Sequence, residues 1–97
     1  MKEELTKIIK HYGILNQLKY IQTEYFELTE AILDREYDEY THIGDIADKY
    51  KYHIAEELAD VLVMLKQVQY FYDIKDTEVE DIMRYKIERQ LKRIEEE

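Results

Sequence analysis

Apolar residues recur along much of this chain at intervals of three and four, the spacing of one face of an α-helix. The longest such run predicts a helix from Ile14 to about Tyr37, and a second run predicts a helix from about Lys51 to Tyr72. The apolar positions are Ile14, Leu18, Ile21, Tyr25, Leu28 and Ile32 in the first run, and Ile54, Leu58, Val61, Leu65, Val68 and Tyr72 in the second. Two helices with such stripes are expected to pack against each other.

Shorter segments lie before and between these two helices. Residues 3–12 form an amphipathic segment that stops at Gly13, a residue type suited to end a helix. Residues 38–51 break the helical pattern with a glycine and scattered Asp, Thr and His. The sequence therefore predicts a short first helix and an irregular connection between the two long ones.

A last helix follows the second long one. Residues 73–76 have the composition of a turn, and Thr77 with Glu80 three residues later has the spacing of a capping box. The apolar positions of this helix are Val79, Met83, Ile87, Leu91 and Ile94, and a Glu-rich end follows them.

Composition supports a helical fold throughout. The chain has no proline and only two glycines, and it is rich in Glu, Lys, Leu, Ile and Tyr. We predict an all-α protein, with residues 1–97 forming a single domain of about four helices. A chain of 97 residues buries proportionally little surface, so its own core is marginal and leaves room for a second copy to complete the bundle.

The charge balance excludes some classes of function. The formal net charge of −9 argues against a general nucleic-acid-binding surface, which needs clustered Lys and Arg, and it is compatible with a bound cation. Without cysteine the chain has neither disulfides nor thiolate ligands. Its charged N-terminal segment is unlike a signal peptide, and no apolar run approaches the roughly 20 residues that span a bilayer. We expect a cytoplasmic protein with no membrane partner.

Two pairs of acidic residues stand beside the apolar stripes. Glu24 and Glu27 lie three residues apart on one face of the first long helix, and each directly precedes a stripe residue. Glu57 and Asp60 have the same arrangement in the second. Packing of the two stripes is therefore expected to bring four carboxylates to one edge of the helix interface.

Spacing alone is weak evidence, because other acidic pairs have the same interval and most such pairs form a solvated helix face. Those pairs are Glu27/Glu30, Glu36/Glu39 and Glu78/Asp81. Glu57 and Asp60 differ because their surroundings, IAEELADVLVML, are apolar nearly all round, as in a buried helix. A buried carboxylate needs a partner. The residues themselves favour a functional site and an internal salt-bridge network about equally.

The ligand types indicate which metal such a site would take. Carboxylates without paired His or Cys suit Mg²⁺, with Mn²⁺ possible, and make zinc a poor candidate. A di-iron bundle needs two Glu-x-x-His motifs, and the chain has only Glu39/His42. His53, one turn before Glu57, is a minor candidate for a supporting contact.

The last helix places Lys86, Arg89 and Arg93 on one face. Such a row can bind phosphates. From the residues alone, the simpler interpretation is that these cations complement the helix dipole and pair with nearby acids such as Glu88.

Three segments together resemble a known family. The segments QTEYFELTEAI, HIAEELADVLVMLKQVQYFYDI and YKIERQLKRI are similar to the MazG-like all-α nucleoside triphosphate pyrophosphohydrolases, over roughly Leu18 to Ile94. The family signature is Glu-x-x-Glu on one helix and Glu-x-x-Asp on the next. Here these positions are Glu24, Glu27, Glu57 and Asp60.

The resemblance implies a reaction and roles for these residues. The four carboxylates would bind Mg²⁺, and the enzyme would hydrolyse a nucleoside triphosphate to the monophosphate and pyrophosphate, serving nucleotide-pool sanitation or control. Glu24 or Glu27 would orient or deprotonate the attacking water, and Lys86 and Arg89 would hold the outer phosphates. The family also implies a homodimer or homotetramer.

Two other interpretations stay open. In one, the chain is a non-catalytic helical oligomer or adaptor, whose acidic pairs provide solubility and partner choice. In the other, the superfamily is the same but the substrate is a deoxyuridine nucleotide, as for a dUTPase-like enzyme, or phosphoribosyl-ATP. The metal ligands would be alike in each enzyme.

Overall fold

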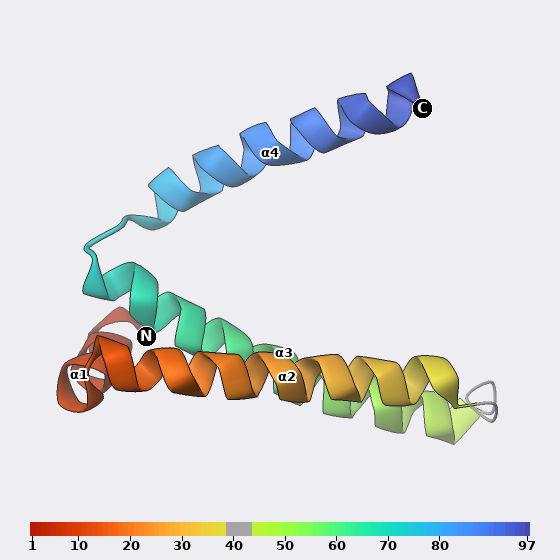
Figure 1. Cartoon of the computed structure of the whole chain (residues 1–97), viewed down its shortest axis with the longest axis horizontal. Helices are drawn as coiled ribbons and strands as arrows, with labels where there is room; N and C mark the ends of the chain where they lie inside the picture. Colours follow the sequence, from red (N-terminus) through yellow and green to blue (C-terminus); the bar gives the residue numbers. More distant parts are fainter. Residues whose placement is uncertain (39–43) are drawn as a thin grey trace.

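The computed structural model describes residues 1–38 and 44–97, and over these residues the chain is all-helical. The helices are α1 (Lys2–Tyr12), α2 (Ile14–Tyr37), α3 (Gly44–Phe71) and α4 (Asp76–Glu96) (Figure 1). Over the described residues, the predicted all-α class and the prediction of about four helices are confirmed. None of the described helices is both long enough and apolar enough to cross a membrane.

The core lies where α1, α2 and α3 meet. The two long helices, α2 and α3, run side by side, and α1 packs against both at one end of the pair (Figure 1). Among the side chains whose burial is described, the buried apolar ones are Leu5, Ile9, Ala31, Val61 and Met64. This is a small core for a chain of 97 residues, as the length of the chain predicts.

The packed face of α2 is displaced by about one position from the predicted stripe. Gln17 and Ala31 are buried, whereas Leu18, Tyr25 and Ile32 of the stripe are exposed. Because α2 carries more apolar residues than one face can hold, the three-four spacing fits two adjacent faces. Contact with α3 covers only one of them.

A buried polar contact also joins α2 to α3. The side-chain Nε2 of Gln17 donates a hydrogen bond to Oε1 of Gln67, at 2.8 Å, and both residues are buried. Buried amides are stable only when their donors and acceptors have partners. This pair therefore favours one register of α2 against α3, and the apolar pattern of the sequence gave no sign of it.

Gly13 joins α1 to α2 in a conformation that suits glycine alone. Its φ is 87° and its ψ is 150°, and its N–H donates to the carbonyl of Ile9 at 2.8 Å. The predicted helix end at Gly13 is confirmed, and α2 resumes at the next residue.

Replacing Gly13 by alanine is expected to destabilise the protein by about 1–3 kcal/mol, because a Cβ strains this backbone region. The added Cβ would meet no atom within 4 Å, so the loss would come from the backbone alone. Urea unfolding followed by circular dichroism measures it. Gln22→Ala, an exposed change within α2, serves as the control and should stay within about 0.5 kcal/mol of the wild type. Equal unfolding free energies for the two variants would contradict the strained geometry.

The start of α3 differs from the prediction. The helix begins at Gly44, not near Lys51, so half of the expected irregular segment is helical. The hydroxyl of Tyr50 donates to the carboxylate of Asp38, which ties the beginning of α3 to the end of α2. Acidic residues that interrupt an apolar pattern are also favourable in the first turn of a helix, where they complement its dipole. The Glu39/His42 motif, and Glu39 of the Glu36/Glu39 pair, lie outside the described residues.

The connection from α3 to α4 is a hydrogen-bonded turn, as predicted. Asp73 adopts a positive φ of 55°, and its N–H donates to Tyr70 O at 3.1 Å, while the N–H of Ile74 donates to Gln69 O at 3.0 Å. This pair of bonds is a Schellman motif, in which a left-handed residue ends a helix. The short connection makes the chain change direction sharply after α3.

The predicted capping box at Thr77 and Glu80 is wrong by two residues. The carboxylate of Glu78 accepts a hydrogen bond from the backbone N–H of Lys75, at 2.8 Å, and α4 begins at Asp76. Thr77 therefore lies inside the helix. A carboxylate three residues after the cap satisfies one of the free N–H groups at the helix start, and Glu78 reaches that group before Glu80 can.

The far part of α4 stands apart from the other helices. Asp76 anchors its start, where Lys66 Nζ and Gln69 Nε2 lie 2.8 and 2.7 Å from the Asp76 carboxylate. Beyond this anchor, α4 diverges from α3, and the backbone of α4 packs on no other described helix (Figure 1). Three of the four helices thus form the packed unit, and α4 is an extended arm.

Candidate metal-binding site

Three carboxylates from two helices meet at the interface of α2 and α3. Oxygen atoms of Glu24 on α2 and of Glu57 and Asp60 on α3 all lie within 4.8 Å of one another. Glu24 has this position because it belongs to the packed face of α2, one turn from Ile21 and Leu28. Glu57 lies in the packed face of α3 in the same way. We call these three residues the carboxylate cluster.

The cluster contains buried oxygen atoms that lack a partner. Glu24 and Glu57 are half-buried, and the Oε2 atom of each is buried without a hydrogen-bond partner among the described residues. Asp60 is exposed, so the cluster is open to solvent on its side. A buried carboxylate oxygen without a donor is unfavourable, and a cation removes that penalty.

Electrostatic repulsion within the cluster also favours a bound cation. Burial, followed by the charges of Glu27 and Asp60, raises the pKa of Glu24 above its ordinary value of 4.5. Burial and the same two charges also raise the pKa of Glu57, and the nearby His53 partly offsets this. Each group thus resists ionisation while its neighbours are charged. A divalent cation at this place would favour the ionised forms.

The donor set fits a hard divalent cation. Three carboxylates from two rigid helices, with no sulfur or imidazole ligand in the cluster, match the preference of Mg²⁺ or Mn²⁺ for oxygen. Mg²⁺ usually keeps several waters and binds only a few protein carboxylates. An open side at Asp60 leaves room for water or for phosphate oxygens.

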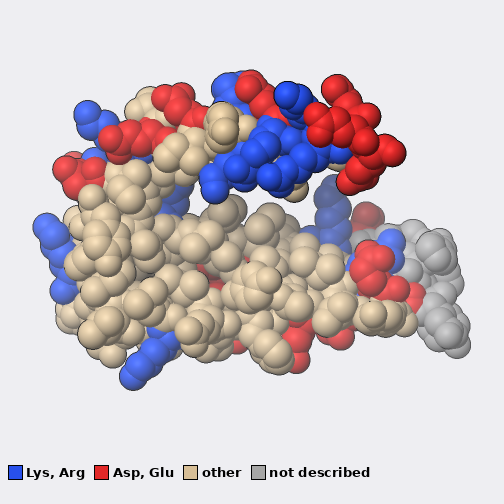
Figure 2. All heavy atoms as spheres, turned by 45° about the horizontal axis from the view of Figure 1, so that its top comes forward, with Lys and Arg blue, Asp and Glu red and all other residues tan. Residues whose placement is uncertain are grey.

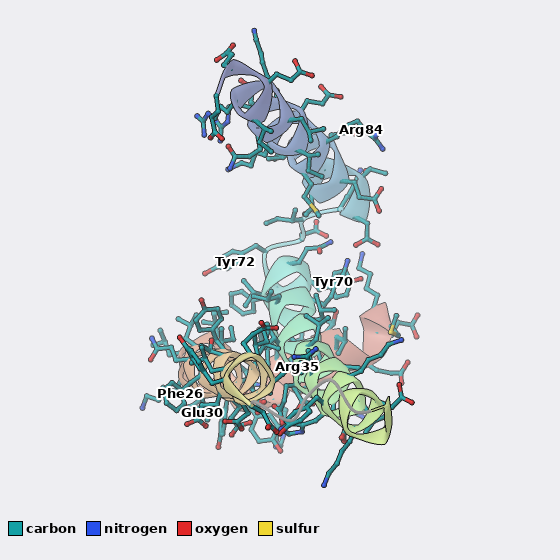
Figure 3. All side chains as sticks on the ribbon, turned by 90° about the vertical axis from the view of Figure 1, so that its right-hand side faces the viewer. Phe26, Glu30, Arg35, Tyr70, Tyr72 and Arg84 are labelled. Carbon is teal, nitrogen blue, oxygen red and sulfur yellow. The ribbon has the colours of Figure 1, made fainter. Side chains whose placement is uncertain are left out.

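The fourth predicted carboxylate stands beside the cluster. Glu27 is exposed, and its oxygens are not part of the group that meets within 4.8 Å. Its charge nevertheless raises the pKa of both Glu24 and Glu57. On the same helix, Phe26 and Glu30 lie on the side that faces away from α3 (Figure 3). Glu27 and Glu30, also three residues apart, are both exposed and so do not form a second site at the helix interface.

The two predicted phosphate-binding residues lie on α4. Lys86 and Arg89 are exposed, and the Arg89 guanidinium lies over the ring of Tyr85, 5.9 Å from its centroid. Basic and acidic side chains both lie along this helix, above the packed helices (Figure 2). Because α4 diverges from α3, the structure does not bring Lys86 and Arg89 into the carboxylate cluster of their own chain.

Comparison of the chain with protein-family models, curated proteins and solved structures gives no match. The functional argument therefore rests on the geometry and chemistry of the carboxylate cluster and its surroundings.

A cavity next to the cluster was not anticipated from the sequence. It has a volume of about 250 Å³ and is lined by Tyr12, Gln17, Tyr20, Glu24 and Met64. Glu24 belongs to both the cavity and the cluster, so a molecule in this cavity would lie next to a bound cation. The sequence gave one indication of this cavity: Gln17 lies seven residues before Glu24 and therefore on the same helix face.

Proposed function

We propose that this protein is a magnesium-dependent nucleotide pyrophosphohydrolase, which cleaves a nucleoside triphosphate into the monophosphate and pyrophosphate. The observation that carries this proposal is the carboxylate cluster of Glu24, Glu57 and Asp60, with its two unpartnered buried oxygens. Magnesium commonly bridges protein carboxylates and substrate phosphates. The similarity of the surrounding segments to MazG-like enzymes supplies the reaction.

The cluster residues would hold the cation, and Glu27 would act beside them. Magnesium bound there supplies Lewis acidity, which lowers the pKa of water and offsets charge on the phosphate oxygens. The carboxylate of Glu27 is exposed and close enough to Glu24 to raise its pKa. Either Glu24 or Glu27 can therefore accept a proton from an attacking water at this edge.

The cavity beside Glu24 supports a nucleoside substrate. The rings of Tyr12 and Tyr20 are about half exposed, at 54% and 57%, and offer aromatic surface next to the cluster. The side chain of Gln17 lines the same cavity. Aromatic faces and an amide are the groups that commonly contact a base. We propose that the base or sugar lies here while the phosphates extend toward Asp60.

Lys86 and Arg89 are proposed to hold the outer phosphates. Their own α4 diverges from the carboxylate cluster, so they can serve a site only when α4 of another copy lies near it. The proposed enzyme is therefore a homo-oligomer, either a dimer or a tetramer.

The exposed apolar surface favours a second candidate, a non-catalytic helical adaptor. Large apolar residues on α2, α3 and α4 are more than two-fifths exposed in the single chain, including Phe26, Leu62 and Ile87. Surfaces of this kind bind other proteins. An adaptor, however, gives no reason for unpartnered carboxylate oxygens at a helix interface.

An assay of pyrophosphate release distinguishes these candidates. The purified protein is incubated with ribo- and deoxyribonucleoside triphosphates, dUTP among them, and with phosphoribosyl-ATP, in Mg²⁺, Mn²⁺ or excess EDTA. We expect pyrophosphate from at least one nucleotide, with no release in EDTA. Preference for dUTP or phosphoribosyl-ATP would change the substrate but keep the site. If no nucleotide were cleaved and none bound with Mg²⁺ present, the adaptor would be the better description.

A further inference from the structure

Three side chains form a closed hydrogen-bond network across the turn between α3 and α4. The Nε2 atom of Gln69 donates to Oδ1 of Asp76 at 2.7 Å and to the backbone carbonyl of Ile74 at 2.9 Å. The Nζ atom of Lys66 donates to the same Asp76 oxygen at 2.8 Å and to Oε1 of Gln69 at 3.2 Å. Both ends of the Gln69 amide thus have partners, although this residue is only 9% exposed. We call Lys66, Gln69 and Asp76 the elbow latch.

The partners of Gln69 allow only one orientation of its amide. If the amide were turned over, its oxygen would face the carbonyl oxygen of Ile74 and the carboxylate of Asp76, with no proton between them. Its nitrogen would face the ammonium group of Lys66, which is also a donor. A buried amide is stable only with its bonds made. The latch therefore has a single arrangement, and a rotation of α4 that moves Asp76 away breaks it.

The charges around the latch favour a carboxylate at position 76. The Nζ atoms of Lys2 and Lys66 lie 5.6 and 5.7 Å from the centroid of the Tyr70 ring. The hydrogen bond from Lys66, followed by that from Gln69, lowers the pKa of Asp76 below its ordinary value of 3.8, and the charge of Lys2 adds to this effect. Cations from α1 and α3 thus face this carboxylate. An uncharged amide in its place would lose both charge-assisted bonds.

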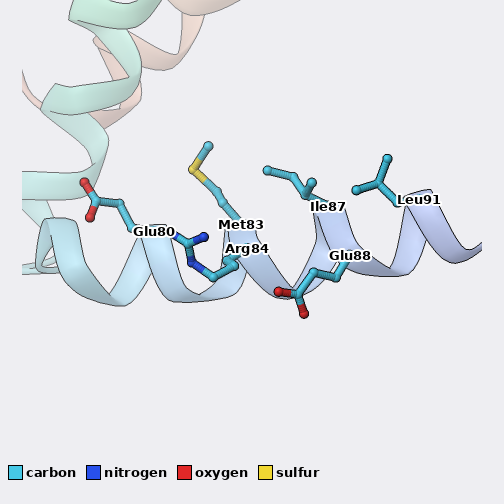
Figure 4. A pocket seen from close by; sticks show the side chains of 6 residues that line it. All are labelled: Glu80, Met83, Arg84, Ile87, Glu88 and Leu91. Atoms are coloured by element: carbon cyan, nitrogen blue, oxygen red, sulfur yellow. The ribbon is translucent and has the colours of Figure 1, made fainter.

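Within the described part of the chain, no other polar contact fixes the direction of α4. Every hydrogen bond or ion pair that joins α4 to another described helix ends on the carboxylate of Asp76. Farther along the arm, Met83, Ile87 and Leu91 point to one side and are 53%, 54% and 55% exposed, along a shallow groove of about 410 Å³ (Figure 4). The apolar face of the arm therefore does not hold it in place within the single chain.

The length of α4 amplifies any movement at its start. Lys86 lies ten residues beyond Asp76, or about 15 Å along the helix axis, so a rotation of about 10° at the elbow moves it by about 2.6 Å. A displacement of about 1 Å in a group that positions a substrate can reduce a reaction rate about a hundredfold. A latch that fixes the angle of α4 therefore has a large effect on where the basic residues of the arm lie.

We infer that the elbow latch fixes the direction of the α4 arm, and that Lys66, Gln69 and Asp76 are thereby positioning residues for Lys86 and Arg89. The role of Lys86 and Arg89 rests on the proposed function, whereas the fixed direction of the arm does not. A partly exposed ion pair contributes little to stability. The latch is therefore expected to set a geometry, and its loss should change the angle of α4 while the helices stay folded.

Distances between two spin labels within one chain test the inference. The chain has no cysteine, so labels at Gln22→Cys on α2 and Glu95→Cys on α4 report on these positions alone. Labelled protein is diluted into a large excess of unlabelled protein, so that only distances within one chain contribute. We expect one narrow distance distribution. Asp76→Asn should broaden it or shift its centre by about 5 Å, the movement of residue 95 for a rotation of about 10°, with unchanged helix content by circular dichroism.

Two further comparisons separate the latch from a general effect of substitution. Asp81→Asn is the matched control, because it makes the same chemical change at an exposed position of α4 outside the latch, and it should keep the wild-type distribution. Lys66→Arg retains N–H donors for Asp76 and should also keep it, whereas Lys66→Met should not. An Asp76→Asn distribution with the centre and width of the wild type would overturn the inference.

A kinetic cycle tests the positioning role. Asp76→Asn is expected to raise KM for the nucleotide about fivefold or more with a smaller change in kcat, as expected when binding contacts to the phosphates are lost. In the Lys86→Met/Arg89→Met double variant the same change should add little, because the latch acts through those two side chains. Additive effects would overturn the positioning role. An inactive wild type would count against the proposed reaction, and the label distances would still decide whether the latch fixes the arm.

Discussion

Glu57→Gln is expected to reduce magnesium-dependent pyrophosphate release about a hundredfold or more, the scale of losing one electrostatic contact in a transition state. The glutamine keeps the volume of the side chain and one acceptor oxygen. It removes the negative charge at the point where Glu24, Glu57 and Asp60 converge. Initial rates of pyrophosphate release at saturating nucleotide, over a range of Mg²⁺ concentrations, measure the effect. Asp60→Asn is expected to behave in the same way.

Glu56→Gln is the matched control for this variant. Glu56 is the preceding residue on α3, is exposed, and belongs to none of the proposed ligands; its charge is the last of the causes that raise the pKa of Glu57. The same chemical change there is expected to leave the rate within about twofold of the wild type, since surface substitutions rarely have large effects. Far-UV circular dichroism establishes that both variants keep their helices. If Glu57→Gln and Glu56→Gln had equal rates, the carboxylate cluster would not be the active site.

The sequence predicted the carboxylate cluster largely because two kinds of pattern agreed there. Helical spacing put Glu57 next to the apolar stripe, and the apolar residues around it indicated that it would be partly buried. The structure confirms that Glu57 and Asp60 meet Glu24 across the helix interface. Their roles in binding magnesium and in catalysis stay predictions, as do those of Glu27, Lys86 and Arg89.

Other features depend on tertiary contacts that a single sequence does not encode locally. The packed face of α2 includes Gln17, a polar residue that a hydrophobic pattern assigns to the surface, and only its contact with Gln67 of α3 identifies it. The start of α3 at Gly44 was missed for a similar reason, because acids and glycine suit both loops and first helical turns. The direction of α4 is set at the turn where Asp73 has a positive φ. Aspartate only occasionally adopts this conformation, so its presence in the sequence does not predict it.

In metal-free protein, Glu57→Gln is expected to raise the melting temperature at pH 7.5 while abolishing the increase that Mg²⁺ gives the wild type. Folding raises the pKa of Glu24 and of Glu57 above 4.5, so the folded state binds these protons more tightly than the unfolded state. Stability from these two groups is therefore greatest below about pH 4.5 and is lost as pH rises through their folded pKa values. Removing one charge is expected to recover part of that loss, and the advantage of the variant should disappear near pH 4.5.

Bound Mg²⁺ makes the wild type the more stable of the two, because its free energy of unfolding rises by about 1.4 kcal/mol for each tenfold rise in free Mg²⁺ above the dissociation constant. Thermal unfolding from pH 4.5 to 7.5, with EDTA or with Mg²⁺, measures both effects, and Glu56→Gln again serves as the control. A wild type that melted at the same temperature with and without millimolar Mg²⁺ at pH 7.5 would argue against a magnesium site at this interface.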